Sequence, residues 1–208
     1  MKKLFVLQVS LLIIFSGSFF GMLYYTDIYN EIKTTIVDQT CFSCIKMDPV
    51  SKFEFTFETV DIKPHPKFIL ENLTKGPIFL AFRADICTAC DIMEPVIKEL
   101  FKVEFGKKEM FYQIINYSGT DIVFYHININ PPYEKETESF YVYDKDRRGG
   151  VPMFVFITLG DNNGTIQPYY ITSYSTLGLD DDQDRKVYFE NLISTGINYY
   201  NKYFDNYK

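Results

Sequence analysis

Hydrophobic and polar residues change their pattern several times along this chain, and the first pattern predicts a membrane segment. Lys2 and Lys3 precede an uncharged, largely apolar run from Leu4 to Tyr25. At about 1.5 Å per helical residue, the 22 residues of this run reach roughly 33 Å, enough for a bilayer core of about 30 Å. Residues 1–25 are therefore predicted to form a transmembrane signal-anchor, with the N-terminus in the cytoplasm and the rest of the chain outside.

A cleavable signal peptide is the alternative for the same segment. Ser16 and Ser18 supply the small residues of a cleavage site, and cleavage would release a secreted protein. A buried core helix fits less well, because the run has no polar face. The first two interpretations both place the remaining residues in an extracytoplasmic space, where thiols can be oxidised.

The patterns of a folded domain begin after a mostly polar stalk, residues 26–50, and cover residues 51–208. Apolar and polar residues alternate over 53–57, as in a half-buried strand. The run Ile78–Phe82 is apolar without alternation, which is typical of a central strand covered on both faces.

Helical spacing follows this central strand. Apolar positions three and four residues apart predict a helix that starts at the Cys87–Cys90 pair and continues to Phe101, with a kink at Pro95. The other expected elements are a short helix over Lys67–Leu73, a strand over Ile122–Ile129, a short helix around Glu134–Tyr141, a strand over Met153–Ile157, its hairpin partner over Thr165–Thr172 and a helix that Asp180–Asp184 caps. The apolar line of that last helix is Phe189, Ile193, Ile197, Tyr200 and Phe204.

Strands that alternate with helices predict an α/β fold with a central mixed β-sheet flanked by helices. Met110–Ser118 is the segment that the pattern assigns least clearly. Composition adds that the domain has ample material for one core, since 47% of the chain is hydrophobic and 18% is aromatic. A net charge of −6 without a basic cluster argues against nucleic acid as a partner.

The four cysteines form two C-x-x-C pairs, and the second pair carries the predicted chemistry. Cys87 stands at the expected start of a helix, where unpaired backbone N–H groups and the helix dipole favour a thiolate. We therefore predict Cys87 as the nucleophile and Cys90 as the resolving thiol. Asp85 would oppose thiolate formation, and Arg83 would offset it. A purely structural disulfide and half of a zinc site are the alternatives for this pair.

Cys41 and Cys44, on the stalk, are open to two interpretations. They form either a second redox pair close to the membrane or a small structural disulfide that stiffens the stalk. A four-thiolate zinc site with Cys87 and Cys90 is disfavoured, because the gap between the two pairs exceeds ordinary zinc-ribbon spacing of about 15 to 20 residues.

The domain resembles the thioredoxin superfamily in three features that occur in order. These are the apolar strand leading into Cys87-Thr-Ala-Cys90, the helix proline Pro95, and Gly150-Val-Pro152 before a strand. The stretch Arg83–Glu94 is also similar to the C-terminal domain of transmembrane disulfide-interchange reductases. The resemblance implies a thioredoxin-like fold over residues 51–208. It also implies a cis peptide bond before Pro152, placed opposite the disulfide for substrate docking.

Two positions differ from the common pattern of that family. Ile86 stands where members often have Trp, and the chain has no Trp at all. Ala81 stands six residues before the first cysteine, where many thioredoxins have a buried acid that accepts a proton.

These observations predict a thiol-disulfide oxidoreductase that acts on extracytoplasmic protein thiols and disulfides. A membrane thiol protein that transfers electrons is a possible partner, and no cofactor or metal is predicted. The alternative is a redox-inactive adaptor or binding module of the same fold, in which the disulfides are structural. His65 and His126 are interpreted as a turn residue and a strand residue without an evident acid partner. Glycosylation triplets begin at Asn72, Asn116 and Asn163.

Overall fold

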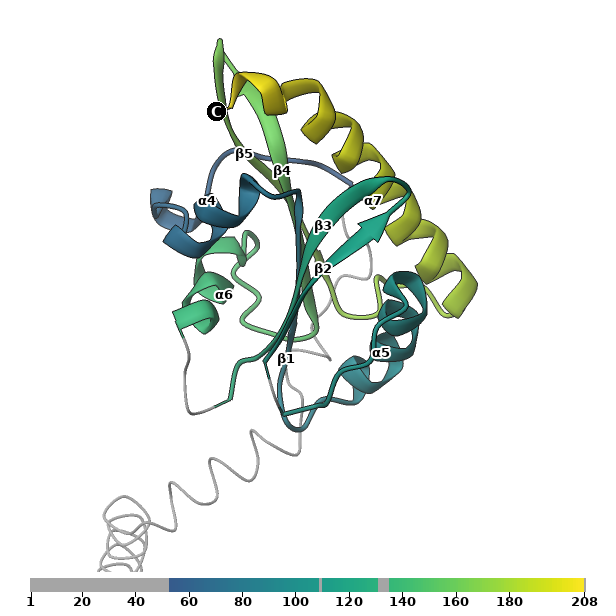
Figure 1. The fold of residues 1–208 in the computed structure, drawn as a ribbon. Helices are drawn as coiled ribbons and strands as arrows, with labels where there is room; N and C mark the ends of the chain where they lie inside the picture. Colours follow the sequence, from purple (N-terminus) through teal and green to yellow (C-terminus); the bar gives the residue numbers. More distant parts are fainter. Residues whose placement is uncertain (1–52, 109, 131–134, 208) are drawn as a thin grey trace, which may run out of the picture. The chain divides into compact units, whose positions relative to one another are not determined.

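A computed structural model of the chain describes residues 53–108, 110–130 and 135–207, which form a five-stranded mixed sheet flanked by helices (Figure 1). The strands are β1 (Ile78–Arg83), β2 (Phe111–Tyr117), β3 (Thr120–Asn128), β4 (Met153–Asn162) and β5 (Thr165–Tyr174), in the spatial order β2-β3-β1-β4-β5. β1 runs parallel to β3, whereas the other neighbouring pairs are antiparallel. The predicted α/β class is confirmed at this level.

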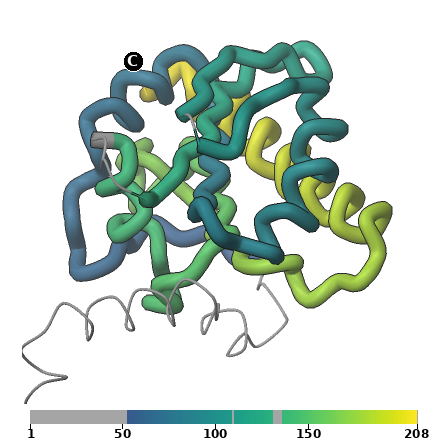
Figure 2. The backbone as a smooth tube through the Cα atoms, turned by 90° about the horizontal axis from the view of Figure 1, so that it is seen from below, coloured from purple at the N-terminus to yellow at the C-terminus, as the bar shows by residue number. Residues whose placement is uncertain are grey.

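Helices cover both faces of the sheet. α4 (Lys67–Leu73) and α6 (Glu138–Tyr143) lie on one face, and α5 (Thr88–Phe101) and α7 (Asp182–Tyr203) lie on the other (Figure 1). Figure 2 shows α5 and α7 side by side. Three short 3₁₀ helices complete the described chain: η1 (Val60–Ile62), η2 (Lys135–Thr137) and η3 (Phe204–Asn206).

β1 is the central strand that its unbroken apolar run predicts. All six of its residues are buried, because β3 and β4 flank it and helices cover both its faces. In this register Ala81 lies opposite His126 of β3 on one side and Phe154 of β4 on the other. The strand ends at Arg83, and a short loop leads from there into α5.

The predicted strand over 53–57 is wrong, because these residues do not form a strand of the sheet. Within 53–57, only Thr56 pairs with a strand, and its partner is Tyr170 of β5. Thr56 N donates to the Tyr170 carbonyl at 2.7 Å, and Tyr170 N donates to the Thr56 carbonyl at 2.9 Å. The alternating phenylalanines instead pack on aromatic side chains, with Phe57 stacked on Tyr169 at a ring distance of 4.3 Å. Side-chain packing therefore explains the alternation without a strand ladder.

The segment that the pattern assigns least clearly, 110–118, contains the edge strand β2. It pairs with β3 through a tight turn in which Ser118 and Gly119 both have positive φ angles, 51° and 87°. Two adjacent residues with positive φ suit the right-handed twist of a hairpin. β2 was hard to recognise because its exposed and half-buried residues do not alternate regularly.

α7 begins as predicted at the acidic cluster. The Asp181 carboxylate accepts hydrogen bonds from the backbone N–H groups of Gln183 at 2.7 Å and Asp184 at 3.3 Å. Gly196 lets the helix approach β4, since a Cβ atom there would lie 2.1 Å from a ring carbon of Phe156. Of the predicted apolar line, the first four residues are buried, whereas Phe204 falls in η3 and stacks on Tyr200 at 4.9 Å.

Some predicted segments lie outside the described residues, and the structure rules out exposure of one predicted glycosylation asparagine. The predicted signal-anchor, residues 1–25, and the stalk with Cys41 and Cys44 are among the residues that are not described. In the described part of the chain, no helix has both the length and the apolar character needed to cross a membrane.

The Asn72 amide is buried and donates to the Phe68 carbonyl and the Tyr125 hydroxyl, so only the two other glycosylation triplets expose their asparagine.

Candidate functional site

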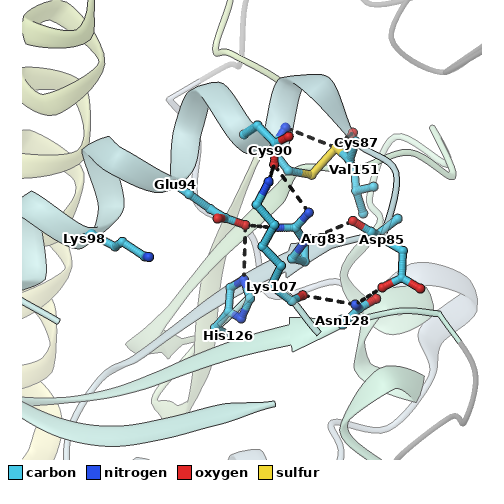
Figure 3. A network of polar contacts seen from close by, with 12 residues as sticks. Arg83, Asp85, Cys87, Cys90, Glu94, Lys98, Lys107, His126, Asn128 and Val151 are labelled. Atoms are coloured by element: carbon cyan, nitrogen blue, oxygen red, sulfur yellow. Dashed lines mark hydrogen bonds and ion pairs between the residues drawn. A yellow bond between two sulfur atoms is a disulfide. The ribbon is translucent and has the colours of Figure 1, made fainter. Parts of the chain in front are cut away.

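A disulfide joins Cys87 and Cys90 where the chain enters α5 (Figure 3). Cys87 is the N-cap residue of this helix, and its Sγ accepts a hydrogen bond from the backbone N–H of Cys90 at 3.1 Å. Sulfur thus takes the place of the oxygen that usually caps a helix. The same N–H groups and the positive end of the dipole favour a thiolate on Cys87 after reduction.

The two sulfur-bearing residues differ slightly in exposure. Cys87 keeps 4% of its surface exposed and Cys90 keeps 1%, so the remaining access leads to Cys87. Ile86 is 62% exposed beside it and provides an apolar rim.

The loop before β4 lies directly beside the disulfide. The Val151–Pro152 peptide bond is cis, which is the isomer that the resemblance implies. The Val151 carbonyl oxygen lies 3.5 Å from Cys87 Sγ. A disulfide sulfur has no proton to donate, but a reduced Cys87 thiol can donate one to this oxygen. Pro152 has no N–H, and its carbonyl accepts from Ser175 N at 2.8 Å.

Asp144 holds this loop from behind. Its buried carboxylate accepts hydrogen bonds from the backbone N–H groups of Arg148 at 3.0 Å and Gly149 at 2.7 Å, and from the Tyr174 hydroxyl at 3.0 Å. The Tyr174 oxygen in turn accepts from Asp146 N at 3.1 Å. Burial raises the pKa of Tyr174, so the hydroxyl keeps its proton for Asp144. This anchor was not predicted from the sequence, although an Asp shortly before Gly149-Gly150 was a visible signal.

A buried charged cluster lies beneath Cys90 (Figure 3). Arg83 is 2% exposed in its side chain and donates from Nη1 to Glu94 Oε1 on α5. Glu94 Oε1 also lies 3.7 Å from Nε2 of His126, which is buried on β3. The His126 ring stacks on Phe105 with 4.1 Å between ring centres. Three ionisable side chains from three different elements thus meet at one point.

Further charges surround this cluster on its exposed side. Arg83 Nη2 lies 3.5 Å from Asp91 Oδ1, which also accepts from Lys107 at 2.6 Å. The hydrogen bond from Lys107 holds the pKa of Asp91 below its usual range. Burial lowers the pKa of Arg83, and the charge of Asp91 opposes that shift. The guanidinium nonetheless stays protonated at neutral pH, because its ordinary pKa is above about 12.

The structure gives Arg83 more acidic partners than expected. The sequence suggested that Arg83 would offset the charge of Asp85 near the thiolate. Its side chain turns inward and pairs with Glu94 and Asp91. The charge of Asp85, which accepts a hydrogen bond from Asn128 Nδ2 at 2.7 Å, also acts on Arg83 and, like that of Asp91, opposes the lowering of its pKa by burial.

A small cavity of about 10 Å³ separates Cys90 from this cluster. Its lining includes Cys90, Ala81, Arg83, Glu94, His126 and Pro152, with apolar side chains closing the rest. A space of this size holds about one water molecule, and such a water needs two to four polar partners. The surface that faces this cavity is almost wholly apolar, so the ionisable side chains present little polar surface to it.

Sequence reasoning missed Glu94 and gave His126 no acid partner. One signal was present, because Glu94 follows Cys90 by four residues and therefore lies on the same face of the helix. The contact to His126 depends on the register of β1 and β3, which the sequence does not reveal. In the described residues, no group of three or more His, Cys, Asp or Glu side chains is arranged to hold a metal ion.

Comparisons of the chain with protein families, with curated proteins and with solved structures found no match. The chain's own residues and the geometry of the Cys87–Cys90 site therefore carry the evidence for function.

Proposed function

We propose that this protein is a thioredoxin-like thiol-disulfide oxidoreductase whose reactive pair is Cys87 and Cys90. The observation that carries the proposal is the arrangement around Cys87. Its sulfur caps α5, forms a disulfide with Cys90 and lies 3.5 Å from the carbonyl that precedes the cis proline Pro152. A reactive thiol, a resolving thiol and an extended backbone segment for a substrate peptide are thus adjacent.

The position of the pair in the sheet supports the same proposal. β1 is a central strand, and the pair follows it at the start of a helix on one face. The loop with Pro152 opens β4, which is the antiparallel neighbour of β1. Two adjacent strands therefore bring together residues that lie more than 60 positions apart in the chain.

The reaction follows from this geometry. In the reducing direction, the Cys87 thiolate attacks a substrate disulfide, forms a mixed disulfide and releases one substrate thiolate. Cys90 then attacks Cys87 Sγ, which restores the Cys87–Cys90 bond and releases the second substrate sulfur. Two electrons pass from the cysteine pair to the substrate, and the oxidising direction is the reverse.

The proposed setting is extracytoplasmic, with the predicted segment 1–25 as membrane anchor. Protein thiols and disulfides are the substrates, and a membrane thiol protein is a candidate electron partner. Cys41 and Cys44 are close in sequence to the anchor and are candidates for relaying electrons to the main pair.

A redox-inactive binding module is the second candidate. The low exposure of both cysteines favours it, because a permanent structural disulfide needs no access for a partner. Ala81 favours it too, because it replaces the acid that many thioredoxins use.

Redox titration of the full chain in detergent separates the two functions. A Cys41→Ser, Cys44→Ser background leaves Cys87 and Cys90 as the only thiols to count by alkylation in glutathione or dithiothreitol buffers. We expect the pair to titrate above about −300 mV, and a Cys90→Ser variant to trap a mixed disulfide on Cys87. The matched Cys87→Ser variant should trap far less, because Cys90 is the more buried sulfur. A potential well below −300 mV together with no trapped species would establish the structural disulfide instead.

A further inference from the structure

We infer that β2 is an interface for a second copy of this chain, whose own β2 pairs with it as an antiparallel strand around a two-fold axis at Ile114. The two five-stranded sheets thereby join into one continuous sheet. This inference goes beyond the proposed function, because the Cys87–Cys90 pair takes no part in the interface.

β2 is the outermost strand on its side of the sheet, next to β3 (Figure 1). None of its seven residues is buried, whereas all six residues of β1 are. Tyr112 and Ile114 each keep 43% of their surface exposed, although both side chains are large and hydrophobic. Among the described residues, no strand pairs with the outer side of β2. This edge is therefore open to a strand from another molecule.

The contacts of β3 show which way Ile114 turns its backbone. Ile114 lies opposite Val123 in the antiparallel register of β2 and β3. The Val123 N–H donates to the Pro77 carbonyl at 2.9 Å, so it points away from β2 and toward the start of β1. Opposite residues of an antiparallel ladder either exchange two hydrogen bonds or exchange none. The N–H and C=O groups of Ile114 therefore point outward from the edge of the sheet.

Two further residues of β2 share this orientation. Bonded and unbonded pairs alternate along an antiparallel ladder, so the backbone groups of Tyr112 and Asn116 also point outward. These residues lie two positions before and two positions after Ile114. The outward N–H and C=O groups therefore form a row that is symmetrical about Ile114.

A second copy of β2 matches this row when it runs antiparallel with its own Ile114 opposite that of the first copy. Ile114 then exchanges two hydrogen bonds with Ile114 of the second copy, and Tyr112 exchanges two with Asn116 of the second copy. The two-fold axis repeats the second of these pairings. Every outward backbone group of the three residues in both copies thus has a partner, in the symmetry that is commonest among homo-oligomers.

The side chains of β2 also suit a second copy. Its sequence, Phe-Tyr-Gln-Ile-Ile-Asn-Tyr, contains no charged residue, so antiparallel pairing places no like charges opposite each other. The net charge of the chain is −6, which makes a neutral edge the favourable place for two copies to meet. Tyr112 and Ile114 lie on the same face of the strand, where the side chains of the second copy cover part of their apolar surface.

A charge-swap experiment tests this pairing on the full chain in detergent. Cys41→Ser and Cys44→Ser form the parent background, because these cysteines could otherwise join two copies covalently. Sedimentation equilibrium measures the dissociation constant of the dimer for the parent, for Ile114→Lys, for Ile114→Glu and for an equimolar mixture of these two variants. The two-fold axis places position 114 opposite itself, so each variant alone sets like charges face to face, whereas the mixture sets Lys opposite Glu.

We expect the parent to dimerise with a dissociation constant of about 10 to 100 µM, as for a small interface. Ile114→Lys and Ile114→Glu should each weaken the dimer by about tenfold or more, and the mixture should recover most of that loss. Ile114→Lys makes the chain less negative, so repulsion between whole molecules cannot explain its effect.

Ile62→Lys is the matched control, because it adds the same charge at an isoleucine that is 92% exposed on η1. The neighbouring Asp61 pairs with Arg147 of the loop before β4, so this position does not belong to the β2 edge. The control should leave the dissociation constant unchanged. Circular dichroism checks the folding of each variant. If the charged variants fail to fold, Ile114→Pro replaces them, because it removes an outward N–H and should also weaken the dimer.

Three results would overturn the inference. A parent that stays monomeric well above the expected dissociation constant would leave the edge free for an extended peptide of another protein. Equal association of the parent, Ile114→Lys and Ile114→Glu would show that the copies meet elsewhere. A mixture that associates no better than either variant alone would exclude the two-fold axis at Ile114. None of these measurements involves thiol exchange, so each result leaves the proposed function unaffected.

Discussion

The two faces of the sheet are both buried, but they are built from different aromatic residues. On the face toward α5 and α7, the buried core contains seven Phe and no Tyr. The second core cluster, mostly on the opposite face, contains two Phe and five Tyr, namely Tyr125, Tyr143, Tyr170, Tyr174 and Tyr200, the last of which comes from the C-terminal end of α7. All five tyrosine hydroxyls take part in hydrogen bonds.

The two faces are therefore stabilised in different ways, one by apolar burial alone and the other by burial together with hydrogen bonds. Phenylalanine burial is strong but has no direction, so it stabilises the contact between helices and sheet without fixing individual loops. A tyrosine hydroxyl has a defined partner, as Tyr174 has in Asp144 and Tyr200 has in the Leu73 carbonyl. The tyrosine face therefore fixes loops, including the one that carries Pro152. The phenylalanine face supplies stability around a cluster of charged side chains.

The largest effect should come from the phenylalanine face. Phe79→Ala removes a fully buried ring that contacts five other phenylalanine rings, and we expect it to lower the free energy of unfolding by about 3–5 kcal/mol. Urea denaturation measures the change. Phe53→Ala, at a ring that is 47% exposed, is the control and should cost much less. If both variants lost the same free energy of unfolding, the phenylalanine core would not be the main source of stability.

A loop effect should dominate on the tyrosine face. Tyr174→Phe keeps the ring but leaves Asp144 and the Asp146 N–H each without one hydrogen bond, so we expect a loss of about 1–3 kcal/mol. Because this anchor holds the loop before Pro152, the attack of Cys87 on a disulfide should also slow. Tyr112→Phe is the control, since Tyr112 lies 43% exposed on β2. If Tyr174→Phe is destabilised but the rate of attack by Cys87 is unchanged, this anchor stabilises the fold without affecting the reaction.

The smallest effect concerns pH. Burial lowers the pKa of His65, whose Nδ1 lies 3.0 Å from the Tyr143 hydroxyl. The unfolded chain, with a His pKa of about 6.5, binds more protons in the window below that value than the folded protein does. This contribution to stability is complete above about pH 6.5 and is lost as the pH falls through the lower folded-state pKa. His65→Asn should flatten the pH dependence of urea unfolding over that window, and an unaltered slope would contradict this assignment.

The sequence predicted the parts of the fold that depend on local pattern. The apolar run of β1, the helical spacing after Cys87 and the acidic cap at Asp181 each identify an element from neighbouring residues alone. The disulfide joins the two cysteines of a short motif, and the resemblance to thioredoxins implied the cis bond before Pro152. These features need little knowledge of how distant segments pack.

The rest of the site depends on distant contacts. Glu94 meets His126 only because the parallel register of β1 and β3 places that histidine opposite Ala81. Arg83 was expected to offset Asp85, but its pairing with Glu94 and Asp91 depends on how α5 packs against β1. The alternation over 53–57 resembled a strand because aromatic packing against β5 gives the same period. Periodicity therefore identifies buried positions more reliably than hydrogen-bond partners.

The two edges of the sheet end differently, and this bears on how the protein associates with other chains. The β5 edge is partly closed, since Thr56 occupies backbone groups of Tyr170 and Pro168 removes a donor. At the β2 edge, the described residues provide no further strand, and its seven residues carry no charge. Uncharged edges of this kind are where sheets grow by adding a strand from another molecule. Asn116, the exposed asparagine of a glycosylation triplet, lies on this strand, so a glycan there would hinder such growth at the edge that the described residues leave open.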